Sequence, residues 1–183
     1  MTILHIDSSI SGEQSASRAI SRSIAGQVQA TQWGEKMVYR DLAAEPLSHL
    51  TLDAFADTSV LDEFLAADTI VIGAPMYNFT LPTQLKAWID RIVIAGKTFR
   101  YTESGPQGLA GGRRVIIALA RGGIYSEGSS AASFEHLETY LRGVFNFIGI
   151  EPEFVAADGL NISPEHRETS IKQAIGETIR LAA

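Results

Sequence analysis

A serine-rich segment near the amino terminus is the first part of the sequence that could do chemistry. Residues 8–18 read SSISGEQSASR and follow a short apolar run. Helical spacing of apolar residues begins at Ala16, with Ser15 or Ser17 available as the N-cap. Hydroxyls, free N–H groups and the positive end of a helix dipole together suit a phosphate monoester. The segment lacks the Gly-x-Gly-x-x-Gly of dinucleotide sites and the lysine of nucleoside triphosphate loops. The alternative is a solvated turn with a serine cap.

Two further segments lie where apolar runs end. Residues 75–79 read PMYNF, and their apolar and aromatic side chains are costly in a loop unless something covers them. A flat ring would do so, and Asn78 could hydrogen-bond its polar edge. Ordinary packing under a neighbouring loop is the alternative. Residues 120–123 read ARGG, which permits close approach of the backbone, although a tight turn alone would explain it.

Other kinds of catalytic site find little support in the sequence. There is no cysteine, which removes disulfides, thiol nucleophiles and thiolate metal sites. His5 lies inside the first predicted strand and is expected to be a core or edge histidine. His49, His136 and His166 do not have metal-ligand spacing, so we expect no metal site. No serine lies in a Gly-x-Ser-x-Gly elbow followed by an acid and a histidine, so a hydrolase has no visible nucleophile.

The elements that must position these segments alternate along the chain. The sequence predicts strands at 2–6, 36–40, 69–74, 115–119 and 154–157, with Pro75 unable to continue a central ladder. It predicts four longer helices. The first begins at about Ala16, the second has Pro82 at N1, the third spans Phe134 to Phe145, and the fourth runs from Pro164 to about Leu181. Short helical stretches are predicted at 52–56 and 61–65.

This alternation predicts an α/β, doubly wound five-stranded parallel sheet with helices on both faces. Ligands of such sheets bind beyond the carboxyl ends of the strands, near the switch point. We therefore expect the three loops to meet at one site.

Composition and charge restrict the function further. The 183 residues include 15 Lys and Arg against 21 Asp and Glu, which gives a net charge of −6. With no basic stripe, nucleic-acid binding is not expected. Hydrophobic residues make up 45% of the chain, which is typical of a globular protein, and no apolar run approaches the ~20 residues of a membrane span. The start MTILHID has no signal-peptide pattern. We expect one cytoplasmic domain covering residues 1–183.

A phosphate cradle and two loops that frame a flat ring describe an FMN site, and here the sequence resembles a known family. It is similar to the FMN-dependent NADH:quinone oxidoreductases and azoreductases. The resemblance covers nearly the whole chain in order. It rests on IDSS at 6–9, the Ser15 and Ser17 pair, GAPMYNF at 73–79, Pro82 with Leu85-Lys86, TFRY at 98–101, Gly105-Pro106 and RGG at 121–123. It implies a flavodoxin-like fold, a homodimer and one FMN per subunit.

The resemblance also implies roles for individual residues. The phosphate end of FMN would be held by Ser9, Ser15, Ala16 and Ser17. The ring would be enclosed by Pro75, Met76, Tyr77, Asn78, Phe79, Ala120, Arg121, Gly122 and Gly123. The substrate would contact Phe79, Tyr101, Val144 and Phe145, with Tyr101 acting on the flavin of the partner subunit. Ala120 departs from the serine that relatives often carry, and Val144 and Phe145 lie where relatives often place an aromatic residue facing the flavin.

The activity that follows is two-electron reduction of quinones and reductive cleavage of azo compounds, with NADH or NADPH as donor and ping-pong kinetics. The chemistry would take place on the flavin, without a catalytic side chain. A flavodoxin-type electron carrier is an alternative, although such carriers are usually more acidic than this chain. A general NAD(P)H:FMN reductase and a non-redox binder of a phosphate ligand are the others.

Overall fold

A five-stranded parallel sheet forms the centre of the structure, a computed structural model that describes residues 1–31 and 36–181. The strand order is β2-β1-β3-β6-β7, and every neighbouring pair is parallel. The strands are β1 (Thr2–Asp7), β2 (Lys36–Asp41), β3 (Thr69–Pro75), β6 (Arg114–Ala120) and β7 (Glu153–Ala157). The predicted α/β class and five-stranded parallel sheet are therefore confirmed.

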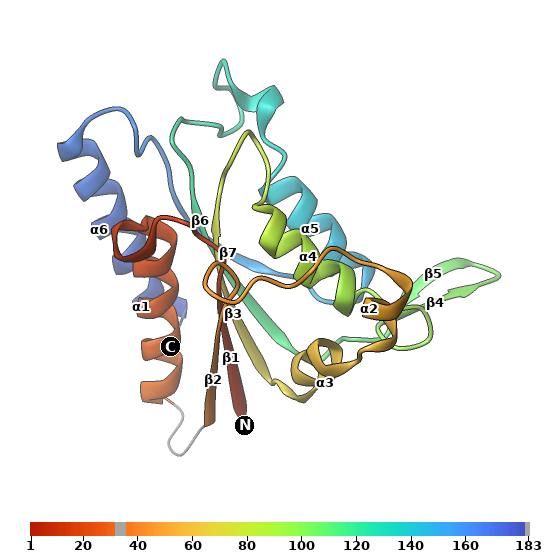
Figure 1. Cartoon of the computed structure of the whole chain (residues 1–183). Coiled ribbons are helices and arrows are strands. Elements are labelled where there is room, and N and C mark those ends of the chain that lie inside the picture. Colours follow the sequence, from red (N-terminus) through yellow and green to blue (C-terminus); the bar gives the residue numbers. More distant parts are fainter. Residues whose placement is uncertain (32–35, 182–183) are drawn as a thin grey trace.

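Helices cover both faces of this sheet (Figure 1). One face carries α1 (Ala16–Thr31) and α6 (Pro164–Leu181). The other face carries α3 (Ser59–Ala66), α4 (Thr83–Ile92) and α5 (Glu138–Phe147), while α2 (Leu52–Ala56) lies in the connection from β2. Two short 3₁₀ helices are η1 (Gly12–Gln14) and η2 (Ala132–Phe134). Among the described residues, no helix is both long and apolar enough to cross a membrane.

The alternation of side chains along the strands gives the molecule two apolar cores. Successive residues of a strand point to opposite faces. Ile3 and Val71 pack toward α1 and α6, whereas Leu4 and Ile72 pack toward α3, α4 and α5. All seven residues of β3 are buried, as expected of a central parallel strand.

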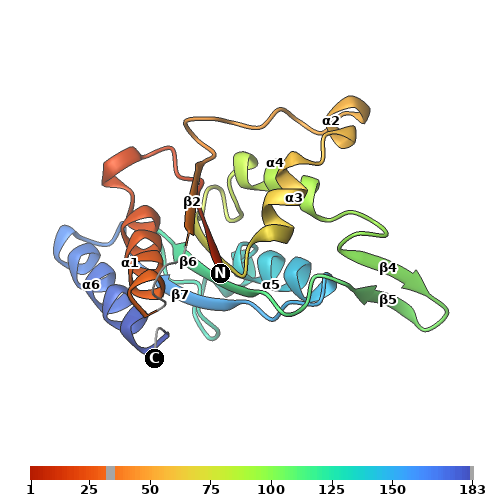
Figure 2. The ribbon, with the colours of Figure 1, turned by 90° about the horizontal axis from the view of Figure 1, so that it is seen from below.

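A two-stranded hairpin was not predicted within the polar stretch 98–112. It consists of β4 (Phe99–Thr102) and β5 (Gly105–Gly108), which pair antiparallel. Figure 2 shows it projecting from the body of the molecule near α3 and α5. Its strands are only four residues long and mostly polar, so the apolar alternation that reveals a strand is absent.

Three predicted boundaries are corrected by the structure. Phe134 lies in η2 and not in α5, because the Glu135 carboxylate accepts the N–H groups of residues 137, 138 and 139 and so starts the helix after it. Pro82 is the N-cap of α4, one position before N1. Pro75 is the last residue of β3, paired with Ala120, so the strand runs one residue further than expected.

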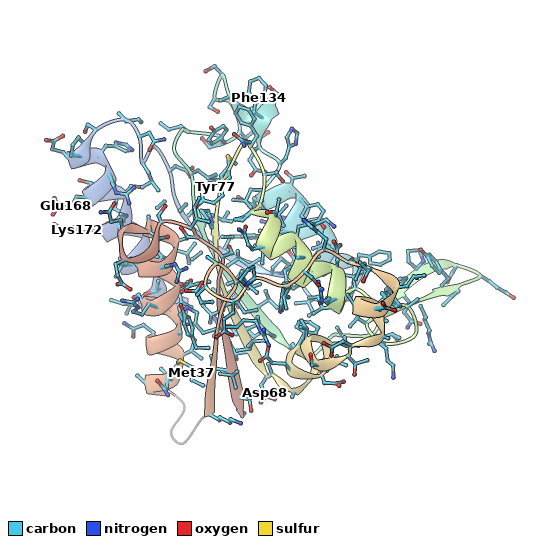
Figure 3. The ribbon with its side chains drawn as sticks, in the orientation of Figure 1. Met37, Asp68, Tyr77, Phe134, Glu168 and Lys172 are labelled. Carbon is cyan, nitrogen blue, oxygen red and sulfur yellow. The ribbon has the colours of Figure 1, made fainter. Side chains whose placement is uncertain are left out.

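The strand order places the switch point between β1 and β3. The chain adds β2 on one side of β1 and then crosses to add β3 on the other. The loops after β1, β3, β6 and β7 consequently lie at one edge, marked by Tyr77 in Figure 3, with Met37 and Asp68 at the opposite edge. This is the edge where ligands of open α/β sheets bind.

Candidate functional site

Two adjoining hollows lie at the switch-point edge, and the three predicted loops line them. The first has a volume of about 230 Å³. It is lined by Ser9, Ser11, Gln14, Ser15, Ala16, Pro75, Met76, Tyr77, Ala120, Gly122, Leu160, Asn161 and Arg167. The second, also about 230 Å³, is lined by Met76, Asn78, Phe79, Gly122, Gly123, Tyr125 and Asn161. The shared residues show that the two form one elongated site.

One end of the site is polar because α1 begins there. Ser15 is the N-cap, and its Oγ accepts the N–H of Arg18 at 3.3 Å and lies 3.1 Å from the Oγ of Ser17. The first amides of a helix have no intrahelical acceptor. Within the described residues, the amides of Ala16 and Ser17 have no other acceptor either. This end therefore has the donors and the dipole that an anion requires.

A buried arginine, Arg18, holds the loop after β1 in place; we call this loop, residues 8–15, the serine loop. The guanidinium of Arg18 donates to the carbonyl of Ser9 at 2.7 and 3.3 Å and to the carboxylate of Asp41 at 2.6 and 2.8 Å. The hydrogen bond to Asp41 raises the pKa of Arg18, and the same bond lowers the pKa of Asp41. Both groups stay charged, so the end of β2 and the serine loop are tied together.

Tyr77 joins the loop after β3 to the loop after β1. Its hydroxyl accepts the N–H of Ile10 at 3.2 Å and lies 3.2 Å from the Oγ of Ser9. The side chain of Tyr77 therefore fixes the spacing of two loops that are far apart in the sequence.

The same β3 loop contains a tight turn with two left-handed residues. Tyr77 and Thr80 exchange backbone hydrogen bonds of 2.9 and 3.1 Å, and between them Asn78 and Phe79 have φ of 47° and 72°. Asparagine tolerates this region, but for a bulky residue such as Phe79 it is strained. The Phe79 ring stacks on Phe134 with centroids 5.0 Å apart and remains 45% exposed. Strain of this kind concentrates at functional sites.

The loop after β6 is bound to a fourth loop, which follows β7. Backbone N–H groups of Gly159, Leu160 and Asn161 donate to carbonyls in residues 121–123 at 2.9 to 3.1 Å. A Cβ on Gly122 would lie 2.4 Å from Nδ2 of Asn161, so any larger residue here would have to displace the Asn161 side chain. The fourth loop was missed from the sequence, although it follows a parallel strand at the same edge, which is the signal that could have found it.

Arg121 does not take the predicted place in the site. Its guanidinium is buried and donates to Asp158 at 2.6 and 3.0 Å and to Glu138 at 3.3 Å. Burial disfavours its charge, but the hydrogen bonds to Asp158 and the nearby carboxylates outweigh this and raise the pKa of Arg121. Its side chain is an internal tie between β6, β7 and α5, and it does not line either hollow.

The structure brings together all the other predicted cofactor residues except Ser17, which is fully buried beneath the serine loop. The predicted substrate residues are more scattered. Phe79 lines the second hollow. Phe145 is fully buried in the core, a placement that contradicts contact with a substrate, and Val144 is half-buried against the same core. Tyr101 is 75% exposed on β4, and the hollows of its own chain do not include it.

Comparison with known sequences gives a consistent result over the full length. Residues 1–181 match the model of a family described as having a flavodoxin-like fold. FMN-dependent NADH:quinone oxidoreductase 2 of Bradyrhizobium diazoefficiens is 50% identical over 201 aligned residues, covering 100% of both chains. FMN-dependent NADH:quinone oxidoreductase of Sinorhizobium fredii is 49% identical over 207, again covering 100% of both.

Solved structures agree with the sequence relatives. An azoreductase from Bacillus anthracis superposes with a TM-score of 0.90 at 30% identity, covering 100% of this chain and 98% of that chain. An FMN-dependent NADH-azoreductase from Bacillus anthracis, in complex with FMN, gives a TM-score of 0.86 at 26% identity with both chains fully covered.

Proposed function

This chain belongs to the flavodoxin-like family of FMN-dependent NADH:quinone oxidoreductases and azoreductases, and from that membership we propose how its residues carry out the reaction. It is an FMN-dependent oxidoreductase with NADH as electron donor. The observation that carries the residue assignment is the elongated site, with an anion-binding end and an aromatic end.

The residues present fit FMN. The amides of Ala16 and Ser17, with the hydroxyls of Ser9 and Ser15, suit a terminal phosphate monoester. The second hollow lies between the turn at residues 76–79 and the two glycines at 122–123, and it suits a flat ring. Asn78 would then hydrogen-bond the polar edge of the ring.

When bound, FMN supplies the two-electron acceptor and donor on which hydride transfer depends. The residues of this chain orient the ring, hold its phosphate and bring donor and acceptor to it, so no side chain has to act as a nucleophile. Because NADH and the quinone or azo compound must reach the same ring, they use it in turn, which predicts ping-pong kinetics. The cytoplasm, which supplies NADH, remains the expected location.

A homodimer completes the proposed site. Tyr101 lies on a hairpin that projects from the body of the chain (Figure 2). The residue is mostly exposed. Exposed aromatic groups of this kind mark interfaces or ligand sites. In a two-fold dimer, each hairpin would place its Tyr101 beside the site of the partner, so each site would be lined on one side by the Tyr101 of the other chain.

The test is the flavin content and the activity of the purified protein. Flavin released from it should be FMN by chromatography, since there is no glycine motif for the diphosphate of FAD. NADH oxidation should be slow without a quinone and rapid with a benzoquinone. Recovery of mainly FAD would contradict the phosphate assignment. Slow NADH oxidation with an accumulated one-electron flavin radical would indicate an electron carrier instead.

A further inference from the structure

Arg167 brings a positive charge to the polar end of the site from α6, which contains none of the three loops predicted to line it. It lies in the first part of α6, after the N-cap Ser163, whose Oγ accepts the N–H of His166 at 3.1 Å. The side chain is half-buried and lines the first hollow together with Ser9, Ser11 and Ser15.

The guanidinium of Arg167 is placed by one hydrogen bond. Its Nη2 donates to the carbonyl of Gln14 at 2.7 Å, directly before the N-cap of α1. A guanidinium carries five N–H donors in a planar fork, so a single carbonyl leaves most of them available.

No carboxylate neutralises this arginine. Within residues 1–31 and 36–181, none lies within ion-pair distance of Arg167. The two acidic residues nearest to it on its own helix have other partners. Glu168 pairs with Lys172, and Glu165 bonds back to Ser163 and to its own backbone.

The place of Arg167 beside the polar end of the site gives its free charge a role. A phosphate monoester carries nearly two negative charges at neutral pH. The hydroxyls and amides at the start of α1 supply only partial charges. A guanidinium at the same hollow supplies a full charge and the planar fork that matches phosphate oxygens.

We propose that Arg167 binds the phosphate of the flavin and is the residue that makes this site prefer the phosphorylated flavin, FMN, to riboflavin. The inference rests on the proposed FMN site. The carbonyl of Gln14 aims the guanidinium, and the serine loop and α6 together close around the anion.

The test compares two ligands that differ only in the phosphate. The flavin-free full-length chain is titrated with FMN and with riboflavin, following the quenching of flavin fluorescence, for the original protein and for Arg167→Gln. Loss of a charged hydrogen bond should weaken FMN binding by about tenfold or more and leave riboflavin binding within about twofold. Added salt should weaken FMN binding less in the variant, because the charge that salt screens has been removed. Arg167→Lys should restore part of the FMN affinity.

Lys172→Gln is the matched control, since it removes one positive charge from the same helix. Figure 3 shows Glu168 and Lys172 on the outer side of α6, away from Tyr77. The affinity of the Lys172→Gln protein for both flavins should be unchanged. Equal loss of FMN and riboflavin binding in Arg167→Gln, or FMN binding within about twofold of the original, would overturn the role of Arg167 while leaving the FMN site intact. If the original protein binds neither flavin, the proposed function fails with it.

Discussion

Two features of Asn78 can each affect flavin binding: its backbone conformation and its side chain. The backbone has a φ of 47°, and the side chain lines the ring end of the site. We expect Asn78→Ala to weaken FMN binding by about 1–3 kcal/mol through loss of a polar partner of the ring. Titration of the flavin-free protein and the reduction potential of the bound flavin are the measurements.

Asn78→Gly separates the two causes, because glycine adopts a positive φ freely. If the side chain contacts the ring, Gly and Ala variants should lose similar affinity. If only the backbone matters, the Gly variant should bind FMN like the original protein. Unchanged affinity, potential and turnover in both variants would show that Asn78 does not bind the flavin.

His5 gives a pH dependence whose sign follows from its burial. Its Nε2 lies 3.0 Å from the Oγ of Ser21 and 3.6 Å from Asp7. Burial lowers the pKa of His5 below the ordinary histidine value of 6.5, although the negative charge of Asp7 acts in the opposite direction. The unfolded chain therefore binds more protons than the folded chain just below pH 6.5. The contribution of His5 to stability is present above that pH and is lost as the pH falls.

We expect the free energy of unfolding in urea to decrease between about pH 7 and pH 5. In His5→Gln, which keeps a hydrogen-bonding side chain near Ser21, this decrease should be smaller. Equal pH slopes in the two proteins would mean that His5 titrates alike when folded and unfolded.

At the scale of elements, the buried strands were the easiest part to predict. The runs that became β3 and β6 are short, apolar and buried on both faces, so their sequence alone identifies them. The hairpin of β4 and β5 could not be found in this way. Only Phe99 among its apolar residues is buried, and it packs against Phe147, which is distant in the sequence.

The site was predictable to the extent that sheet geometry determines it. The three loops converge because parallel strands end at one edge. The side-chain details depend on contacts between distant segments. The family resemblance implies that Arg121 contacts the flavin, but its guanidinium donates to Asp158 and Glu138 and so turns inward. Phe145 was placed at the substrate, but the helical register turns it into the core. Arg167 lies far along the chain from the serines with which it lines the first hollow.

The hairpin is held to the body by a close contact between two glycines. A Cβ on Gly108 would lie 2.2 Å from the backbone N of Gly149, at the end of α5. Gly108→Ala must therefore separate β5 from α5, and we expect it to destabilise the protein by about 1–3 kcal/mol. Thermal unfolding is the measurement. Gly26→Ala is the control, because it meets nothing within 4 Å on the exposed side of α1 and should stabilise the helix by up to about 1 kcal/mol. A Gly108→Ala protein as stable as the original would show that the two elements separate without cost.

At the scale of the whole molecule, the chain by itself leaves the ring end of the site open and an aromatic hairpin exposed. Phe99 lies edge-on to Tyr101 with centroids 5.5 Å apart, and Phe99 is in turn packed on Phe147. Tyr101 is thus held by the core of its own chain while its ring faces outward. An aromatic side chain that its own chain positions but leaves exposed is suited to a site on a second copy.

We expect Tyr101→Ala to raise the KM for quinone or lower turnover while FMN stays bound. Mixed dimers test whether Tyr101 acts at the flavin of its own subunit or at that of the partner. One chain carries Tyr101→Ala, and the other carries Ser11→Glu, which sets a carboxylate at the exposed rim of the phosphate end and must first be shown to hold no FMN. If Tyr101 acts across the interface, the single flavin faces the intact Tyr101 of the partner, and activity per flavin should be near normal. With both substitutions on one chain and an original partner, the flavin faces the mutated residue and the kinetics should match the Tyr101→Ala homodimer. The reverse pattern would assign Tyr101 to its own subunit, and full activity in a monomer by sedimentation would refute the shared site.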